Sequence, residues 1–293
     1  MKKIGMIGIG MMGHGIATNL VKKGHHLSVL AHEGNRPIDN LTSQGVKTFK
    51  TPNELAAHSD VIILCVTGTP QVEEVLLGEG GVLEGLLPQS IIIDCSTSVP
   101  TSTEKIANKV IKRGGFFLDS PMTRTPKEAA EGRLNLLVGG DSEVFDICRP
   151  ILSCFAENIV HVGPVGSGHR MKLLHNYVSL GSVALLAEAA SCAQMSGVDA
   201  QTFVEVLSIG GGWGAALERL KPFLLSNDNS GLRFSLSNAL KDISYYSSMA
   251  EQMKVDRTVA LAVKATIEAA CDHGDGHRLM PELVDIISSR RDQ

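Results

Sequence analysis

The sequence predicts an α/β domain with a mostly parallel, doubly wound sheet, followed by an all-α domain that a long helix joins to it. Short apolar runs alternate with amphipathic stretches over residues 1–163, whereas only helical stretches follow over residues 164–293. Alternation of strand and helix is typical of a parallel sheet covered by helices on both faces. A stretch at 168–196 has apolar residues at helical spacing and no proline, so it predicts the long joining helix.

The period of the apolar residues predicts the individual elements. The runs at 61–66 and 91–93 are continuously apolar, as strands buried on both faces are. Strands are expected at 3–8, 27–31, 60–66, 90–95, 116–119, 134–138 and 158–162. Helices are expected in the first domain at 12–23, 52–58, 70–77, 100–113, 126–131 and 142–153, and in the second at 200–209, 214–223, 236–252, 257–272 and 280–290.

The composition indicates a cytoplasmic protein that binds neither nucleic acid nor membrane. Its net charge is -4, whereas a nucleic-acid partner requires a basic face. No run of eighteen uncharged apolar residues occurs, and glycines interrupt the apolar N-terminal stretch, so neither a membrane span nor a signal peptide is expected. The six cysteines form no CxxC pair and no Cys–His cluster, which predicts buried, reduced thiols and no metal site.

A glycine-rich segment, GIGMMG at 8–13, follows a predicted strand and opens a predicted helix. This context is typical of the Rossmann loop that holds the pyrophosphate of a dinucleotide, although a turn with no ligand is the alternative. The first glycine permits the tight turn, the second admits the pyrophosphate, and the third lets helix and strand pack closely. The helix N-terminus also favours phosphate. The expected cofactor contacts are Gly8, Ile9, Gly10, Met11, Met12 and Gly13.

The end of the second predicted strand bears on the choice between NAD and NADP. An acidic residue there binds the ribose of NAD, whereas basic residues accommodate the 2′-phosphate of NADP. Ala31 stands near the acidic position, and Glu33 follows it. Because Arg36 reaches far while a displaced Glu33 can point to solvent, the residues weakly favour NADP over NAD; a surface Arg36 without a ligand is equally compatible. His32, Asn35 and Arg36 are the expected contacts.

Polar residues also follow two later strands, at the rim where open α/β sheets bind ligands. Val66 and Thr67 follow one strand, and Ser96 and Thr97 follow the next. We expect Val66, Thr67 and Thr97 to contact the cofactor and Ser96 to contact the substrate. Ser98 is expected to be the N-cap of the helix after it.

The long helix carries a candidate catalytic pair. Lys172 and Asn176 are four residues apart, so they share one helix face. Gly166 and Gly168 before them let another backbone or a ligand come close. A lysine in a water-poor cleft can pass a proton to a carbonyl oxygen, but most helical lysines are solvated surface residues. Three histidines near these motifs are interpreted as structural or supporting residues: His14, His169 and His175.

Four features in order make the chain resemble the β-hydroxyacid dehydrogenase family over essentially its whole length. They are the glycine loop, Asp119-Ser120-Pro121, the Gly-x-Gly-x-x-x-Lys-x-x-x-Asn run that ends at Asn176, and Lys241-Asp242. The resemblance implies a Rossmann domain and a helical domain that forms a homodimer; the expected assembly is a homodimer or a homotetramer. It also implies that Lys172 is the general acid/base, that Asn176 binds substrate and that Lys241 lies near the cofactor.

One loop departs from that family. Most members read Asp-x-Pro-Val-Ser-Gly-Gly, whereas this chain has Met122-Thr123-Arg124-Thr125 after its proline. The loop resembles the variant of sulfolactaldehyde reductases, where it holds a sulfonate. This resemblance implies that Thr123, Arg124 and Thr125 bind an anionic substrate group, for which a guanidinium offers a charged, planar fork. The alternative is a surface ion pair of Arg124 with Glu128 or Glu131.

Together these features predict an NAD(P)-dependent oxidoreductase that interconverts a short anionic 3-hydroxy acid, or a sulfonate analogue, and its semialdehyde. An imine reductase is one alternative, against which Lys172 counts because those relatives usually carry another residue there. A second alternative is a decarboxylating enzyme like 6-phosphogluconate dehydrogenase, against which the length of 293 residues counts because that enzyme has a longer C-terminal region. The third alternative is an inactive cofactor-binding scaffold, against which Lys172, Asn176 and Lys241 speak.

Overall fold

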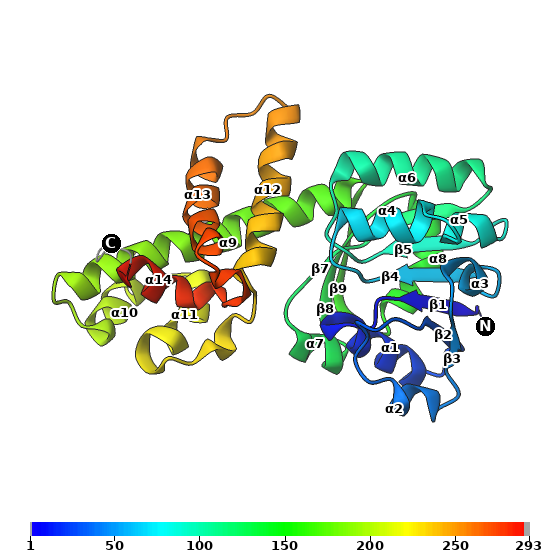
Figure 1. Ribbon diagram of the computed structural model, residues 1–293, viewed down its shortest axis with the longest axis horizontal. Helices are drawn as coiled ribbons and strands as arrows, with labels where there is room; N and C mark the ends of the chain where they lie inside the picture. The colour runs from blue at the N-terminus through cyan, green and yellow to red at the C-terminus, as the bar shows by residue number, and fades with distance from the viewer. Residues whose placement is uncertain (1, 290–293) are drawn as a thin grey trace. The chain divides into compact units, whose positions relative to one another are not determined.

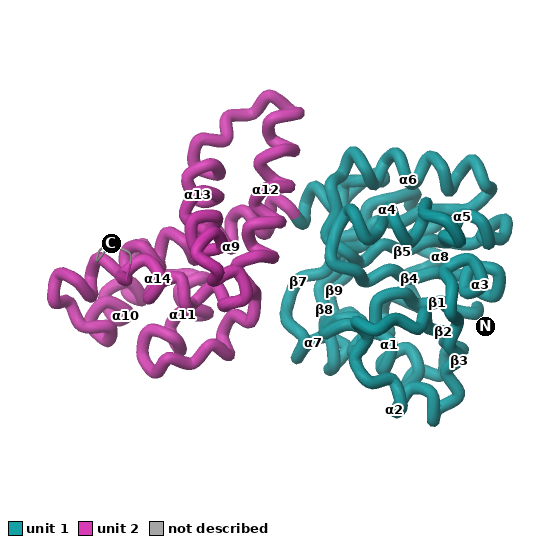
Figure 2. Tube along the Cα trace, viewed as in Figure 1, with its two compact units in different colours: residues 1–172 teal, residues 173–293 magenta. Residues whose placement is uncertain are grey.

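The computed structural model describes residues 2–289 and divides into two compact units. The first unit ends at Lys172 and the second begins at Leu173 (Figure 2). This division falls inside helix α9 (Ser167–Met195), whereas the sequence placed the domain boundary after Gly163. One continuous helix therefore contributes residues to both units.

A nine-stranded sheet forms the first unit (Figure 1). Its strands are β1 Ile4–Ile7, β2 Leu27–Leu30, β3 Lys47–Phe49, β4 Val61–Leu64, β5 Ile91–Asp94, β6 Phe116–Asp119, β7 Met122–Thr123, β8 Leu134–Gly139 and β9 Ala156–Gly163. The order is β3-β2-β1-β4-β5-β6-β8-β7, with β9 paired to β8. The six strands from β3 to β6 are parallel, and β8 joins β6 and β7 antiparallel. The chain changes direction across the sheet between β1 and β4, which is where open α/β sheets bind ligands.

Helices cover both faces of this sheet, and alternate strand residues point to opposite faces. Ile63 packs in a cluster with Ile16 and Leu20 of α1, whereas its neighbour Ile62 packs in another with Leu55 of α3. Burial on both faces explains why the runs at β4 and β5 are continuously apolar. The helices are α1 Met11–Lys22, α2 Asp39–Thr42, α3 Pro52–Ala56, α4 Thr69–Leu77, α5 Val82–Gly85, α6 Pro100–Lys112, α7 Pro126–Glu131 and α8 Ser142–Leu152.

The second unit consists of helices, as the sequence predicts. Leu180 and Val183 of α9 pack with Phe223 and Ile243 in its core. By length and composition α9 could cross a membrane; Leu180 and Val183 are buried inside the unit, whereas Val178 and Leu185 are exposed. The helix expected at 280–290 is interrupted, because Pro281 lies in a short 3₁₀ turn before α14. The other helices are α10 Ala200–Ser208, α11 Ala215–Ser226, α12 Leu236–Gln252, α13 Thr258–Asp272 and α14 Leu283–Ser289.

Four short strands and α-helices of the described residues lie outside the sequence predictions. They are β3, β7, α2 and α5, each of two to four residues. Such lengths contain at most one helical turn or two strand periods, so apolar periodicity carries little information about them.

Candidate functional site

The glycine loop joins β1 to α1, and its three glycines differ in what surrounds them. Gly8 has φ +94°, and a Cβ there would lie 2.3 Å from the carbonyl oxygen of Cys65. A Cβ on Gly13 would lie 1.9 Å from the carbonyl oxygen of Gly8. Around Gly10, no atom of the described residues other than its neighbours in the chain lies within 4 Å of the Cβ position. The backbone at Gly10 is thus open to a ligand, as the approach of a pyrophosphate requires.

The N-terminus of α1 starts at this open position. Gly10 is the N-cap residue, and within residues 2–289 no side chain caps the helix and no acidic residue stands in its first turn. The first N–H groups of α1 and its partial positive charge are therefore available to an anion. These residues fit the phosphates of a dinucleotide cofactor.

The segment after β2 supports the glycine loop. Asn35 donates its side-chain N–H to the carbonyl of Leu30 at 2.9 Å and accepts the N–H of Ile9 at 3.2 Å. The N–H of Arg36 donates to the carbonyl of Ile9 at 2.8 Å. Asn35 and Ile9 thus hold the loop in place through hydrogen bonds within the chain. The side chains of His32 and Arg36 are exposed and remain candidates for the 2′ group.

The ends of β4 and β5 are tied together by Ser96. Its hydroxyl oxygen accepts the N–H of Val66 at 3.0 Å, and the residue is only 3% exposed. Ser96 is therefore built into the rim, while Thr67 is exposed and Thr97 is half-buried beside it. Parallel neighbours end on the same edge of a sheet, so these residues share that edge with the glycine loop.

The expectation that Ser98 caps the next helix is wrong. The N-cap residue of α6 is Val99, whose N–H donates to the hydroxyl of Thr69 at 2.8 Å. Ser98 is buried, and its hydroxyl has no hydrogen-bond partner in the described part of the chain. The side chain that accepts a hydrogen bond at the start of α6 is thus that of Thr69, which lies 30 residues from Val99 in the chain.

Asp119, at the end of β6, fixes the start of α9. Its carboxylate is fully buried and accepts the N–H of Gly166 at 2.7 Å and the N–H of His169 at 2.8 Å. A Cβ on Gly168 would lie 2.6 Å from the carbonyl oxygen of Asp119, so only glycine permits this approach. At Gly168, a close neighbour that the Gly-x-Gly motif admits is thus the backbone of β6. Lys172, one turn further along the helix and 9% exposed, is held relative to β6.

Two further predicted site residues, Asn176 and Lys241, belong to the second unit, and both contact Asp242 there. Asn176 is 5% exposed and donates to Asp242 at 2.6 Å. The Nζ of Lys241 lies 3.1 Å from the second oxygen of Asp242 and 5.5 Å from the centre of the Tyr245 ring. The sequence assigned Asp242 no role, although its place directly after Lys241 was a signal.

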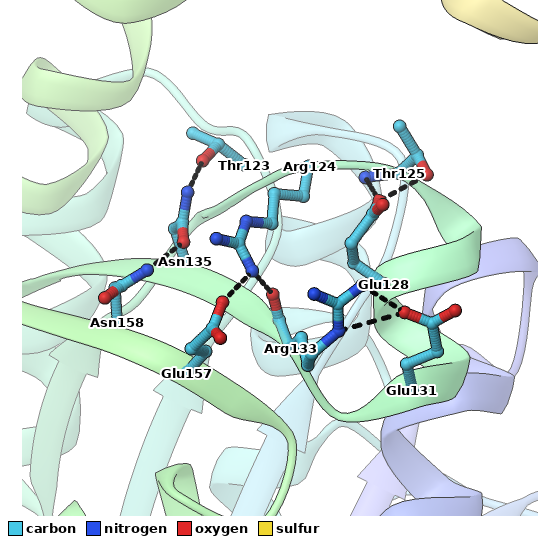
Figure 3. A network of polar contacts seen from close by, with 9 residues as sticks. All are labelled: Thr123, Arg124, Thr125, Glu128, Glu131, Arg133, Asn135, Glu157 and Asn158. Atoms are coloured by element: carbon cyan, nitrogen blue, oxygen red, sulfur yellow. Dashed lines mark hydrogen bonds and ion pairs between the residues drawn. The ribbon is translucent and has the colours of Figure 1, made fainter.

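The loop after β7 is held by its own network (Figure 3). Arg124 pairs with Glu157 of β9 and donates to the carbonyl of Arg133. Thr123 accepts from Asn135 at 3.1 Å. The expected alternative pairing of Arg124 with Glu128 or Glu131 is wrong, because Thr125 binds the former in a capping box on α7 and Arg133 binds the latter. Arg124 also has φ +81°, a conformation that favours glycine.

The cysteines depart from the expectation that all are buried. All six are free thiols, and Cys95 and Cys148 are buried, but Cys65, Cys154 and Cys271 are half-buried and Cys192 is exposed. Burial, with a smaller contribution from the nearby Asp94 carboxylate, raises the pKa of Cys65 to about 12.

Alkylation of the folded protein at about pH 8 should modify Cys192 and spare Cys65 and Cys95. The thiolate is the nucleophile, and at that pH a thiol with a raised pKa stays protonated. Peptide mass spectrometry after iodoacetamide treatment measures each site, with urea-unfolded protein as the control that labels all six. Equal labelling of Cys65 and Cys192 in the folded state would contradict the burial described above.

Comparison with known proteins matches the two halves of the chain to two family models. Residues 3–163 match the family model of the NAD binding domain of 6-phosphogluconate dehydrogenase, and residues 166–287 match that of the NAD-binding region of NADP-dependent 3-hydroxyisobutyrate dehydrogenase. An uncharacterised oxidoreductase of Synechocystis is 34% identical over 85% of this chain and 86% of its own. An NAD-dependent L-serine dehydrogenase of Pseudomonas aeruginosa is 33% identical over 76% of this chain and 74% of its own. The solved structure of Mycobacterium tuberculosis 3-hydroxyisobutyrate dehydrogenase with L-serine matches with a TM-score of 0.86 at 24% identity, covering 99% of this chain and 100% of that one.

Proposed function

The chain belongs to the β-hydroxyacid dehydrogenase family, and on that premise we propose that it interconverts a short anionic 3-hydroxy acid, or a sulfonate analogue, and its semialdehyde. The observation that carries this proposal is the placement of Lys172. It is a buried lysine one turn beyond a helix start that Asp119 fixes to the sheet bearing the glycine loop. The relatives that act on L-serine and 3-hydroxyisobutyrate support the substrate class, because both compounds are short 3-hydroxy acids.

The residues of this chain divide the work of such a reaction. A bound nicotinamide supplies the hydride for reduction and takes it up in oxidation. Lys172 donates a proton from Nζ to the aldehyde oxygen as the carbonyl carbon is reduced, and it accepts that proton in alcohol oxidation. Asn176, four residues further along α9, binds the substrate through its amide, whose orientation Asp242 fixes. Asp119 contributes by holding the first turn of α9.

For the cofactor we propose NADP over NAD. Ala31 offers no carboxylate to the ribose at the end of β2, and the exposed Arg36 lies on the segment bonded to the glycine loop. The 3-hydroxyisobutyrate dehydrogenase of the matching family model is NADP-dependent, whereas the L-serine dehydrogenase is NAD-dependent, so the relatives favour neither cofactor. Comparison of KM for NADH and NADPH tests this proposal, and a strong preference for NADH would overturn it.

A substrate panel tests the reaction itself. The panel contains L-serine, 3-hydroxyisobutyrate, tartronate semialdehyde, 3-sulfolactaldehyde and a cyclic imine, each with both cofactors and followed by nicotinamide absorbance. Turnover of a 3-hydroxy acid or its semialdehyde supports the proposal. Turnover of the imine alone would identify an imine reductase, and tight NADPH binding without any turnover would identify a binding scaffold.

We further propose that Arg124, with Thr123 and Thr125, binds the anionic group of the substrate by exchanging Glu157 for it. The side chains of Arg124 and Glu157 are 27% and 45% exposed, and an ion pair exposed to that extent contributes only about 0–1 kcal/mol. Such a pair can therefore yield to a substrate anion. A carboxylate or sulfonate also meets the geometry of the guanidinium.

The variant Arg124→Gly should raise KM for an anionic substrate by about 10- to 100-fold, because a hydrogen bond to a charged group contributes roughly 1.5–3 kcal/mol. It should fold normally, since glycine suits the backbone at φ +81°. Steady-state kinetics on a charged and an uncharged aldehyde measure the difference. Glu157→Gln is the matched control, because it removes the competing carboxylate and should leave KM unchanged or lower. If both variants raise KM alike, Arg124 acts through its pair with Glu157 and does not bind substrate.

A further inference from the structure

His169 is a fully buried histidine at the start of α9. Its Nε2 lies 3.1 Å from the carbonyl oxygen of Ser96, and its Nδ1 lies 2.7 Å from the hydroxyl of Thr103. Its backbone N–H donates to Asp119. Ring and backbone together connect α9 to the segment after β5, to α6 and to β6.

The hydrogen bonds of the ring define its orientation. A carbonyl oxygen can only accept, so Nε2 must carry a hydrogen toward Ser96. The hydroxyl of Thr103 has one hydrogen, which it donates either to Nδ1 or to the carbonyl of Val99 at 3.2 Å; in the second case it accepts a hydrogen from Nδ1. The ring is therefore hydrogen-bonded at both nitrogens whether it is neutral or protonated. Rotation or displacement of the ring would break buried hydrogen bonds in either state.

The carboxyl group of Asp94 also lies near the ring, with one of its oxygens 3.8 Å from Nε2. That oxygen is buried, and among residues 2–289 it has no hydrogen-bond partner. Burial raises the pKa of the Asp94 carboxyl, with the nearby His169 and the hydrogen bond of Ser96 opposing that shift. The hydrogen bonds to Ser96, Thr103 and Asp119 thus hold His169 in a single position.

We propose that His169 is a positioning residue that sets where Lys172 stands relative to the carboxyl ends of β4 and β5. His169 precedes Lys172 by three residues on one helix, so a shift of its ring shifts the helix turn that bears the lysine. At its other end the ring holds Ser96, whose hydroxyl in turn holds Val66. The inference rests on the proposed function, because Lys172 is the proton donor there.

Two amide variants separate the two ends of the ring. In His169→Gln the amide nitrogen reaches the place of Nε2 and retains the bond to Ser96. In His169→Asn the amide is one bond shorter and reaches only the place of Nδ1, so the bond to Ser96 is lost. We expect His169→Gln to keep kcat within about threefold of the wild type and His169→Asn to lower it by roughly 10- to 100-fold, the range expected for a misplaced catalytic group. In His169→Gln the Kd for NADPH should change by less than about threefold, because the bonds of Ser96 and of the glycine loop are retained.

Ser90→Ala is the matched control for lost stability. Ser90 lies just before β5, at the end opposite Ser96, and its buried hydroxyl donates to the carbonyl of Ser59 at 3.2 Å. This variant should lower Tm and leave kcat unchanged. The inference is wrong if His169→Asn keeps wild-type kcat, or if His169→Gln lowers kcat as much as His169→Asn does.

Amide hydrogen exchange gives a readout independent of turnover. A peptide covering 164–175 should exchange faster in His169→Asn than in the wild type or in His169→Gln, because only the asparagine variant releases the first turn of α9 from Ser96. If no panel compound is turned over by the wild type, the proposed function fails, and this exchange comparison still decides the role of His169. Equal exchange in all three proteins would overturn the inference.

Discussion

Replacement of Lys172 by methionine should lower kcat by about 10²–10⁴-fold, the usual contribution of general acid–base catalysis. Methionine matches the lysine side chain as far as Cε and suits a residue that is 9% exposed, so packing should be retained while the proton donor is lost. Turnover is measured with whichever panel substrate the wild type uses, and Tm and the Kd for NADPH are measured beside it. We expect both of these quantities to stay close to wild type.

A second lysine serves as the control for the loss of positive charge on a helix. Lys264 of α13 is partly exposed and pairs with Glu268 at 3.6 Å, so Lys264→Met removes the same group outside the proposed machinery. Its kcat should be unchanged. Turnover close to wild type in Lys172→Met would remove the lysine from the mechanism and leave the family fold as the only supported part of the proposal.

The glycine loop should show two different failures when alanine is introduced. Gly10→Ala should keep the Tm of the wild type, because the protein leaves the Cβ position open, and should weaken NADPH binding. Crowding the pyrophosphate by one methyl group costs about 1–3 kcal/mol, or roughly 5- to 150-fold in Kd. Gly13→Ala should lower Tm as well, because its Cβ would meet the carbonyl oxygen of Gly8 at 1.9 Å.

Thermal unfolding and NADPH fluorescence titration distinguish the two variants. A Gly10→Ala protein that binds NADPH as tightly as the wild type would show that the phosphates do not approach the backbone there. Gly214→Ala is the control, because Gly214 has φ 161° and an open Cβ position and so tolerates the substitution. Gly24→Ala is unsuitable as a control, because Gly24 has φ +84°.

The sequence predicted the layers of the fold because burial leaves a periodic record in the chain. Continuous apolar strands such as β4 and amphipathic helices such as α6 were located within a few residues of their ends. The glycine loop was predicted for the same kind of reason, since Gly8 and Gly13 each answer a local backbone requirement. The short elements β3, β7, α2 and α5 leave no such record and were missed.

The partners of individual polar side chains could not be predicted in this way. Arg124 pairs with Glu157, 33 residues away on another strand, and the sequence offered only acids close in the chain. Asp119 was recognised as part of a motif, but its role became clear only when β6 brought it to the N–H groups of Gly166 and His169. Long-range pairing depends on strand order, which local pattern does not encode.

The continuity of α9 limits how the protein can be dissected. A fragment ending at Gly163, after β9, would contain the whole sheet but would leave the carboxylate of Asp119 buried without the N–H groups that it accepts. A fragment extended through the helix would keep those bonds but expose the side chains of Leu180 and Val183, which pack in the other unit. Either cut removes contacts that the dinucleotide-binding unit or the helix needs. The two units are therefore expected to stay together in evolution and in domain exchange.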